Sequence, residues 1–278
     1  MKRLLPILSL LLVFSCQPSG FTPAPEQLVV EGWIEDGGAP YIYLTTSFAP
    51  SPVPRQISSL ADQLFTSATV RLSDGEKEVI LTGLASKRFY PPFVYTSAYM
   101  TGEAGKTYTL TVESSRFHAR ATATIPPSRP LESLTVVPFG DDPGQRLIEA
   151  RFRDNPSTKD YYFAFVKIEK TDSTYVPSEL SLVDDSLLEG EETTLLLRPG
   201  VSLARSEGRQ AYRRGERVGV KFRTMDGQMY GIWKAVAEQQ AFSALPFFSL
   251  DETLPGNVDG ALGYFAGYGC STYEVTIP

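Results

Sequence analysis

The chain has 278 residues and a formal net charge of −6, from 26 basic and 32 acidic residues. This acidic balance excludes an electrostatic footprint for nucleic acid and attachment to anionic lipid by charge alone. The hydrophobic share of 42% and the aromatic share of 12% indicate a globular protein with a substantial core.

The start of the chain has the features of a bacterial lipoprotein signal peptide. A charged start is followed by an apolar run over residues 4–14, and Val13-Phe14-Ser15-Cys16 resembles a lipobox. The run is shorter than the roughly twenty residues of a membrane-spanning helix. We therefore expect a signal peptide over residues 1–15, palmitate or similar acyl chains on Cys16, and a lipidated tether over residues 16–26. The alternative is an ordinary secretory peptide with an incidental cysteine.

From Leu28 onward the hydrophobic pattern alternates with a period of two, which is typical of strands with one buried and one solvated face. The alternation is clearest over residues 68–73, 107–113 and 117–125. Turn signals such as Asp74-Gly75 separate these segments. Short strands at this spacing predict an immunoglobulin-like β-sandwich over residues 27–126.

A proline-rich connector interrupts this pattern. Pro126-Pro127-Ser128-Arg129-Pro130 cannot continue a central strand, so we place a domain boundary there. Beyond it we expect a larger antiparallel β domain over residues 131–278. Its clearest predicted strands cover residues 131–137, 147–153, 161–168, 217–222 and 273–277.

Three segments of this second domain have distinct patterns. Tyr161 to Val166 is apolar on both faces, which predicts a central strand. The polar and acidic stretch over residues 172–214 predicts a long hairpin or an insertion. A helix near residues 227–241 is predicted by Asp226 as N-cap and by one apolar stripe. That stripe should bury Trp233 against the sheet.

The residues needed for most catalytic and metal chemistry are scarce. His118, the only histidine, lies on the polar side of a strand, where we interpret it as a surface residue. One histidine excludes the usual zinc sites, and no Gly-x-Ser-x-Gly elbow or phosphate loop occurs. Cys270 has no redox partner if Cys16 is acylated, and we interpret it as a small buried apolar residue. We expect no catalytic residues, no metal and no cofactor.

Paired carboxylates keep one enzymatic alternative open, because glycoside hydrolysis needs only two of them. The candidates are Asp154, Asp160, Asp184, Asp185, Glu189 and Asp226. Calcium could be held by oxygen ligands in Gly140-Asp141-Asp142-Pro143-Gly144 or in residues 184–192, although neither has the spacing of a known loop.

Two clusters of aromatic residues are candidates for ligand binding. They cover residues 89–93 and 242–248. Aromatic side chains on loops can stack on sugars or fill a partner's pocket. They can also simply pack beneath long loops.

Two sequence motifs carry a resemblance to a known family. One is Leu28-Val29-Val30-Glu31-Gly32-Trp33-Ile34 followed by Tyr41-Ile42-Tyr43-Leu44-Thr45, and the other is Asn257-Val258-Asp259-Gly260-Ala261-Leu262-Gly263-Tyr264-Phe265-Ala266-Gly267-Tyr268. Together they resemble a Bacteroidetes lipoprotein family, the domain of unknown function numbered 4249. The glycines at 260, 263 and 267 would permit tight turns or close backbone approach. Trp33 is expected in the core.

The resemblance implies a lipoprotein of the outer membrane, in the cell envelope, associated with a TonB-dependent receptor. No catalytic residue is carried over from the family. We therefore expect a non-catalytic accessory or ligand-binding partner of such a receptor. The alternative is a carbohydrate-active enzyme or a sugar-binding module. Facing carboxylates in a cleft, roughly 5–10 Å apart, would favour the enzyme, and an aromatic surface would favour binding.

Overall fold

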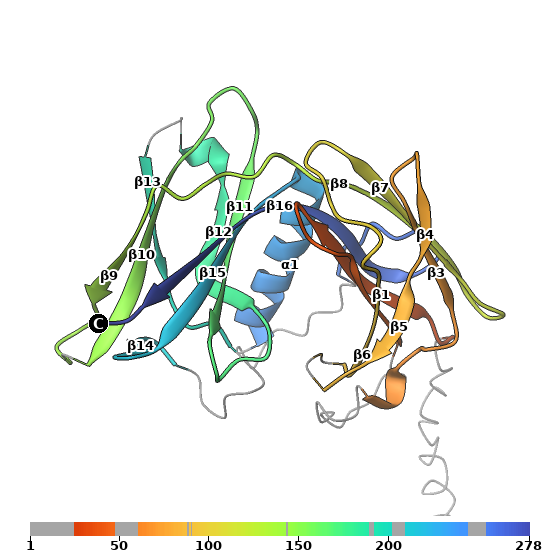
Figure 1. Cartoon of the computed structure of the whole chain (residues 1–278), viewed down its shortest axis with the longest axis horizontal. Coiled ribbons are helices and arrows are strands. Elements are labelled where there is room, and N and C mark those ends of the chain that lie inside the picture. The colour runs from red at the N-terminus through yellow and green to blue at the C-terminus, as the bar shows by residue number, and fades with distance from the viewer. Residues whose placement is uncertain are drawn as a thin grey trace, which may run out of the picture.

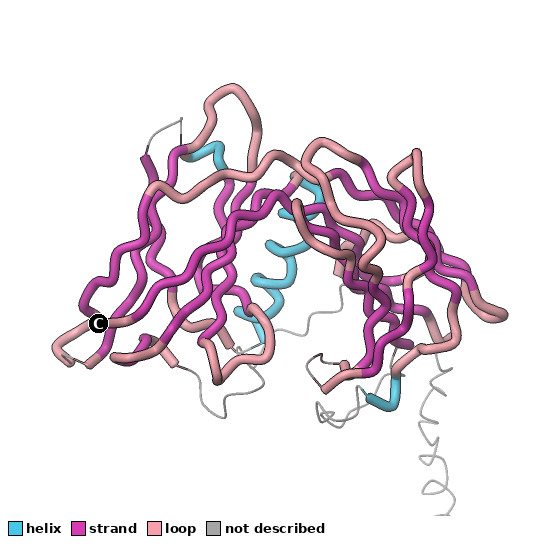
Figure 2. The backbone as a smooth tube through the Cα atoms, viewed as in Figure 1, coloured by secondary structure: helices cyan, strands magenta, loops and turns pink. Residues whose placement is uncertain are grey.

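The computed structural model describes residues 25–47, 61–87, 89, 91–142, 144–188, 192–201, 209–243 and 254–278. Within these ranges the chain is mostly β with one long helix, which confirms the predicted fold class. Figure 1 shows two lobes of strands with the helix between them, and Figure 2 shows how strand dominates both lobes. No helix in these ranges is long and apolar enough to cross a membrane. The predicted signal peptide, Cys16 and most of the tether lie outside the described residues.

The first lobe is a β-sandwich formed by two sheets. Its strands are β1 (Leu28–Glu35), β2 (Tyr41–Thr46), β6 (Phe93–Thr96) and β5 (Thr82–Ala85), facing β4 (Glu78–Ile80), β3 (Thr69–Ser73), β7 (Thr107–Glu113) and β8 (His118–Thr124). The alternation of apolar and polar residues explains how the two sheets pack. In β8, Ala119, Ala121 and Ala123 are buried between the sheets, while the residues between them are exposed. His118 is exposed, as predicted.

The second lobe is also built from two facing sheets. They contain β12 (Val176–Asp184), β11 (Tyr161–Ile168), β15 (Arg217–Met225) and β16 (Leu262–Thr276) on one side, and β13 (Glu192–Leu197), β10 (Gln145–Arg153), β9 (Ser133–Pro138) and β14 (Tyr212–Arg213) on the other. β11 lies between β12 and β15 and is buried on both faces, as predicted. The short 3-10 helix η2 (Asp185–Leu187) follows β12.

The predicted hairpin or insertion over residues 172–214 was wrong. β12 pairs with β11 and β13 pairs with β10, so these two strands belong to facing sheets. Exposed and acidic side chains on these strands hid their apolar positions. Leu195 and Leu197 of β13 are nevertheless buried in the core of the lobe.

β16 belongs to both lobes. Its first part pairs in parallel with β1, from Leu262 to Tyr268, and its second part pairs antiparallel with β15, from Gly269 to Thr276. One eight-stranded sheet therefore extends through both lobes in the order β12-β11-β15-β16-β1-β2-β6-β5. The irregular connector before β9 crosses between the lobes separately. A boundary at residues 126–130 assigns all of β16 to the second domain, although its first half completes the sheet of the first.

Two glycines of β16 allow a close approach between backbones. Gly263 has a φ of +98°, and a Cβ there would lie 1.9 Å from the carbonyl oxygen of Val30. A Cβ on Gly267 would lie 2.4 Å from the carbonyl oxygen of Thr124 in the facing sheet. These positions require glycine because any side chain would collide with fixed backbone.

Helix α1 (Gly227–Ser243) packs on the outer face of the large sheet. Asp226 caps it by accepting a hydrogen bond from the backbone N–H of Met229 at 2.8 Å, as the sequence predicted. Met229 and Ile232 are buried against Phe163 and Phe165 of β11. The helix thus shields part of a sheet face whose other part lines a cavity.

Candidate functional site

A cavity of about 360 Å³ lies where the large sheet passes from one lobe to the other. It is formed by the outer faces of β1, β2, β16, β11 and β15, together with α1, the start of β12 with the segment before it, and Phe89 ahead of β6. The lining residues are mostly aromatic or cationic: Glu31, Trp33, Tyr41, Tyr43, Phe89, Phe165, Lys167, Ser173, Thr174, Tyr175, Pro177, Lys221, Arg223, Trp233, Tyr264 and Tyr268. Its volume is within the lower part of the range for small-molecule sites.

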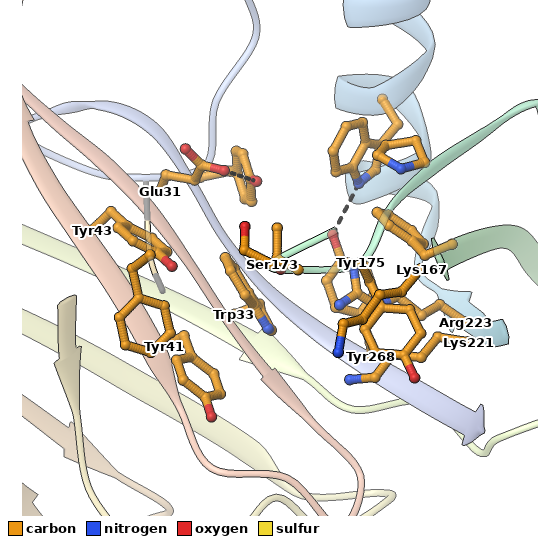
Figure 3. Close-up of a pocket in the computed structure, with 16 residues that line it drawn as sticks. Glu31, Trp33, Tyr41, Tyr43, Lys167, Ser173, Tyr175, Lys221, Arg223 and Tyr268 are labelled. Atoms are coloured by element: carbon orange, nitrogen blue, oxygen red, sulfur yellow. Dashed lines mark hydrogen bonds between the residues drawn. The ribbon is translucent and has the colours of Figure 1, made fainter. Parts of the chain in front are cut away.

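The wall contributed by the first lobe is aromatic. Trp33 stacks on Tyr41, with ring centroids 5.7 Å apart, and contacts Tyr43 at 5.8 Å. Phe89 packs against both tyrosines at 5.9 and 6.3 Å. Figure 3 shows Trp33, Tyr41 and Tyr43 on one side of the cavity. These rings project outward because β1 and β2 place their alternate, aliphatic residues in the sandwich core.

Glu31 lies next to this wall and is hydrogen-bonded to a strand of the sheet. The hydroxyl of Tyr264 donates to Glu31 Oε1 at 3.0 Å. Glu31 is open to the cavity, but the surrounding protein displaces much of the bulk water. This desolvation raises the pKa of Glu31, and the bond from Tyr264 only partly opposes the rise. The pKa of Tyr264 is raised as well, first by burial and then by the charge of Glu31.

Two cations of a buried ion triad, Lys221 and Arg223, lie on the opposite side of the cavity (Figure 3). Glu35 of β1 forms ion pairs with Lys221 and Arg223 of β15, reaching across β16. The side chains of Glu35 and Arg223 are only 9% and 8% exposed. Burial acts to raise the pKa of Glu35, but the attraction and hydrogen bonds of the two cations outweigh it and lower the pKa. The triad therefore remains charged at neutral pH.

Aromatic rings surround the guanidinium of Arg223. Its central carbon lies 4.0 Å from the ring centroid of Phe165, 4.6 Å from that of Tyr268 and 5.9 Å from that of Trp33. Cation–π contacts of this kind stabilise a desolvated guanidinium by roughly 0.5–2 kcal/mol each. They also fix its orientation at the cavity wall.

The helix completes the cavity through Trp233. Its indole N–H donates to the hydroxyl of Tyr268 at 2.9 Å, and its ring meets the edges of Phe163 and Phe165. Burial raises the pKa of Tyr268 to about 12, against the lowering effects of Arg223 and of the Trp233 bond. Trp233 packs on the sheet as predicted, but it is half-buried because one part faces the cavity. Trp33, expected in the core, also lines the cavity.

A comparison with models of known protein families identifies the family of this chain. The sequence model of the family "Domain of unknown function (DUF4249)" matches residues 18–274. This chain belongs to the DUF4249 family. A search of curated proteins found no match.

The motifs that resemble DUF4249 proteins supply much of the cavity. Six lining residues lie within them: Glu31, Trp33, Tyr41, Tyr43, Tyr264 and Tyr268. The sequence contained this signal, since Trp33 of β1 and Tyr41 and Tyr43 of β2 alternate with core residues and so occupy outward positions. It was missed because an outward aromatic residue can equally be covered by another part of the fold.

Four of the carboxylates considered for catalysis in this DUF4249 chain gather away from the cavity. Asp154 and Asp160 both accept hydrogen bonds from the hydroxyl of Tyr162, at 2.6 and 3.4 Å. Asp185 accepts from the backbone N–H of Asp160, and Asp184 caps η2. Asp226 is the cap of α1, and Glu189 lies outside the described residues. None of the four lines the cavity.

This acidic cluster anchors the connector between the lobes. Arg129 donates to Asp160 Oδ2 at 3.1 Å and to the hydroxyl of Thr158 at 3.1 Å. The pKa of Tyr162 is strongly raised by burial and by its bond to Asp154. The carboxylates are thus engaged in holding loops and the connector in place.

The remaining sequence candidates are dispersed. Cys270 is half-buried, where we had expected full burial, and burial raises the pKa of its thiol. Asp142 accepts from the backbone N–H of Gly144 at 2.7 Å within a turn. No group of three or more His, Cys, Asp or Glu side chains in the described ranges is placed to hold a metal ion. Of the aromatic clusters, Phe89 reaches the cavity, and residues 244–248 lie outside the described ranges.

Proposed function

We propose that this protein is an outer-membrane lipoprotein, anchored through Cys16, that binds a small ligand without transforming it. The observation that carries this proposal is the cavity at the junction of the lobes. It combines aromatic surface with a small number of fixed polar groups, which is typical of ligand sites. Its main polar groups are held by neighbouring side chains, so little ordering is needed when a ligand binds.

The second part of the proposal is a partner. A lipid anchor would confine the protein to a membrane surface, where an outer-membrane transporter is concentrated laterally. The protein would then act as an accessory of a TonB-dependent receptor and present or retain the ligand for it. Rigid sandwiches with exposed edge strands, such as β5, suit recognition of a protein partner.

The alternative is a carbohydrate-active protein. The aromatic wall favours a sugar-binding module, because aromatic faces stack on sugar rings. A hydrolase of the paired-carboxylate type needs a second acid near the first. Glu31 is the one carboxylate among the described lining residues, and Glu35 behind it is committed to two cations. This arrangement supports binding over hydrolysis.

Affinity purification tests the partner. A C-terminally tagged full-length chain is purified in mild detergent from native outer membranes and the co-purifying proteins are identified by mass spectrometry. We expect a TonB-dependent receptor at near-stoichiometric yield. A protein that purifies alone and cleaves a glycan, with activity lost in Glu31→Gln, would favour the enzyme instead.

A further inference from the structure

The charges of the buried ion triad do not balance. Lys221 and Arg223 share the carboxylate of Glu35, so one positive charge of the triad remains uncompensated. Lys167, the third cation at the cavity, lies 3.2 Å from Glu169 and is balanced by it. Cys270 and Tyr268 lie near Arg223, but burial raises the pKa of both groups, so both are neutral at pH 7. Glu31 accepts a hydrogen bond from Tyr264 on the facing side, and among the described residues it forms no ion pair with Lys221 or Arg223 (Figure 3).

Arg223 also has an unused hydrogen-bond donor. Its side chain is 8% exposed, and its Nε has no hydrogen-bond partner among the described residues. Buried polar groups nearly always have partners, so this buried Nε shows that the hydrogen bonds of the guanidinium are incomplete. Guanidinium groups bind carboxylates through two parallel bonds, and such bonds are strong when water is excluded. An anionic ligand group in contact with Lys221 and the Arg223 guanidinium would supply the missing negative charge.

The rest of the lining is suited to a ring that carries hydroxyl groups. Trp33 and Tyr41 provide ring surface on the facing side. Hydroxyls of Tyr43, Tyr175 and Ser173 and the carboxylate of Glu31 can exchange hydrogen bonds with such a ligand. A purely apolar anion would leave these polar groups without partners. A neutral sugar would leave the triad charge without a partner.

We propose that the cavity binds an acidic sugar, whose carboxylate pairs with Lys221 and Arg223 while its ring packs against Trp33. This inference rests on the proposed ligand-binding function and names the substrate class for it. The volume of about 360 Å³ restricts the occupant to a short fragment or the end of a longer glycan.

Intrinsic fluorescence provides a direct assay. The chain has two tryptophans, and both Trp33 and Trp233 line the cavity. The full-length, detergent-solubilised protein is titrated with digalacturonate and, in parallel, with its methyl ester. The ester keeps the rings and hydroxyls but lacks the charge. We expect the acid to change the fluorescence and to bind about tenfold or more tightly than the ester, since hydrogen bonds to charged groups are strong.

Substitutions at Lys221 then locate the charge. Lys221→Met leaves Glu35 and Arg223 as a balanced pair, so the variant should fold and bind digalacturonate about tenfold more weakly. Lys221→Arg keeps the charge and should bind nearly as well as the unmodified chain. Lys77→Met removes an equal charge from the exposed turn before β4 and should have no effect. Circular dichroism verifies that each variant folds. The comparison of acid and ester on the unmodified chain tests the need for a ligand carboxylate without any variant.

Three results of these titrations would overturn the inference. They are equal affinity for acid and ester, unchanged binding in Lys221→Met, and no fluorescence response to either compound. A tripeptide that binds more tightly than digalacturonate through its C-terminal carboxylate would also overturn it and would assign the cavity to peptides. None of these results affects the receptor purification, so failure of the ligand class and failure of the proposed function remain distinguishable.

Discussion

Glu35→Gln would remove the one carboxylate that neutralises two cations at the junction of the lobes. Glutamine keeps the size of the side chain and can still accept one hydrogen bond. Lys221 and Arg223 would then face each other without a counter-ion, and the Arg223 side chain is only 8% exposed. Removing one member of a buried ion pair costs about 3–5 kcal/mol, because the remaining charge is left desolvated.

The loss is measurable by urea unfolding followed by fluorescence of Trp33 and Trp233. For a chain of this size, about 3–5 kcal/mol corresponds to a fall in Tm of roughly 6–20 °C. Glu113→Gln is the matched control, since Glu113 also pairs with an arginine but is 45% exposed. Its cost should remain below about 1 kcal/mol. Adding Arg223→Met to Glu35→Gln should recover part of the stability, because fewer charges remain unpaired.

A loss in Glu35→Gln no greater than in Glu113→Gln would refute this reasoning. It would mean that water reaches the triad and replaces the carboxylate. Acid provides a second measurement on the same group. Because the folded-state pKa of Glu35 is lowered from its ordinary value of 4.5, its stabilisation is present above pH 4.5 and is lost as the pH falls through the folded pKa. The stability of Glu35→Gln should therefore depend less on pH in that acidic range.

Three further outcomes are expected. Trp233→Ala should lower the free energy of unfolding by about 3 kcal/mol. Lys234 is the exposed neighbour, and Lys234→Ala should change that free energy by no more than about 0.5 kcal/mol; equal effects would mean that the helix does not pack through Trp233. Gly263→Ala should prevent folding or lower the free energy of unfolding by at least about 3 kcal/mol, because backbone strain and collision with the Val30 carbonyl combine. Gly37 has open space around it, so Gly37→Ala should lower the free energy measured by urea unfolding by only about 1 kcal/mol. Cys16→Ala should abolish labelling by a palmitate analogue and release the protein from membranes or leave the precursor uncleaved; an unlabelled unmodified chain would contradict the lipid anchor.

Local patterns predicted the elements that depend on local rules. β11 was found at its predicted bounds, and its central position was predicted because a run that is apolar on both faces, Tyr161 to Val166, must be buried on both faces. The helix was found because its stripe and its Asp226 cap are both local signals. β13 was missed because its three leucines follow an acidic stretch and do not alternate with polar residues, and because its pairing with β10 is set by distant parts of the chain.

The site was harder to predict than the fold, because it depends on which outward faces remain uncovered. Trp33 has the same pattern whether it packs beneath a helix or faces a cavity. Glu35 and Arg223 are 188 positions apart, and no periodicity relates them. The glycines of β16 indicated close approach, but not that one strand would join two sheets.

β16 also determines when the molecule becomes complete. As the chain is synthesised, β16 is the last of the described strands to emerge, yet β1 of the first lobe lacks its parallel partner until β16 arrives. Pairing between β1 and β16 is slow, because the long chain between them must come together before any contact forms. A protease cut in the connector would consequently leave two pieces that remain associated, with residues 262–268 of one inserted beside β1 of the other. Two separately produced fragments, meeting at that same position, should therefore reconstitute the cavity.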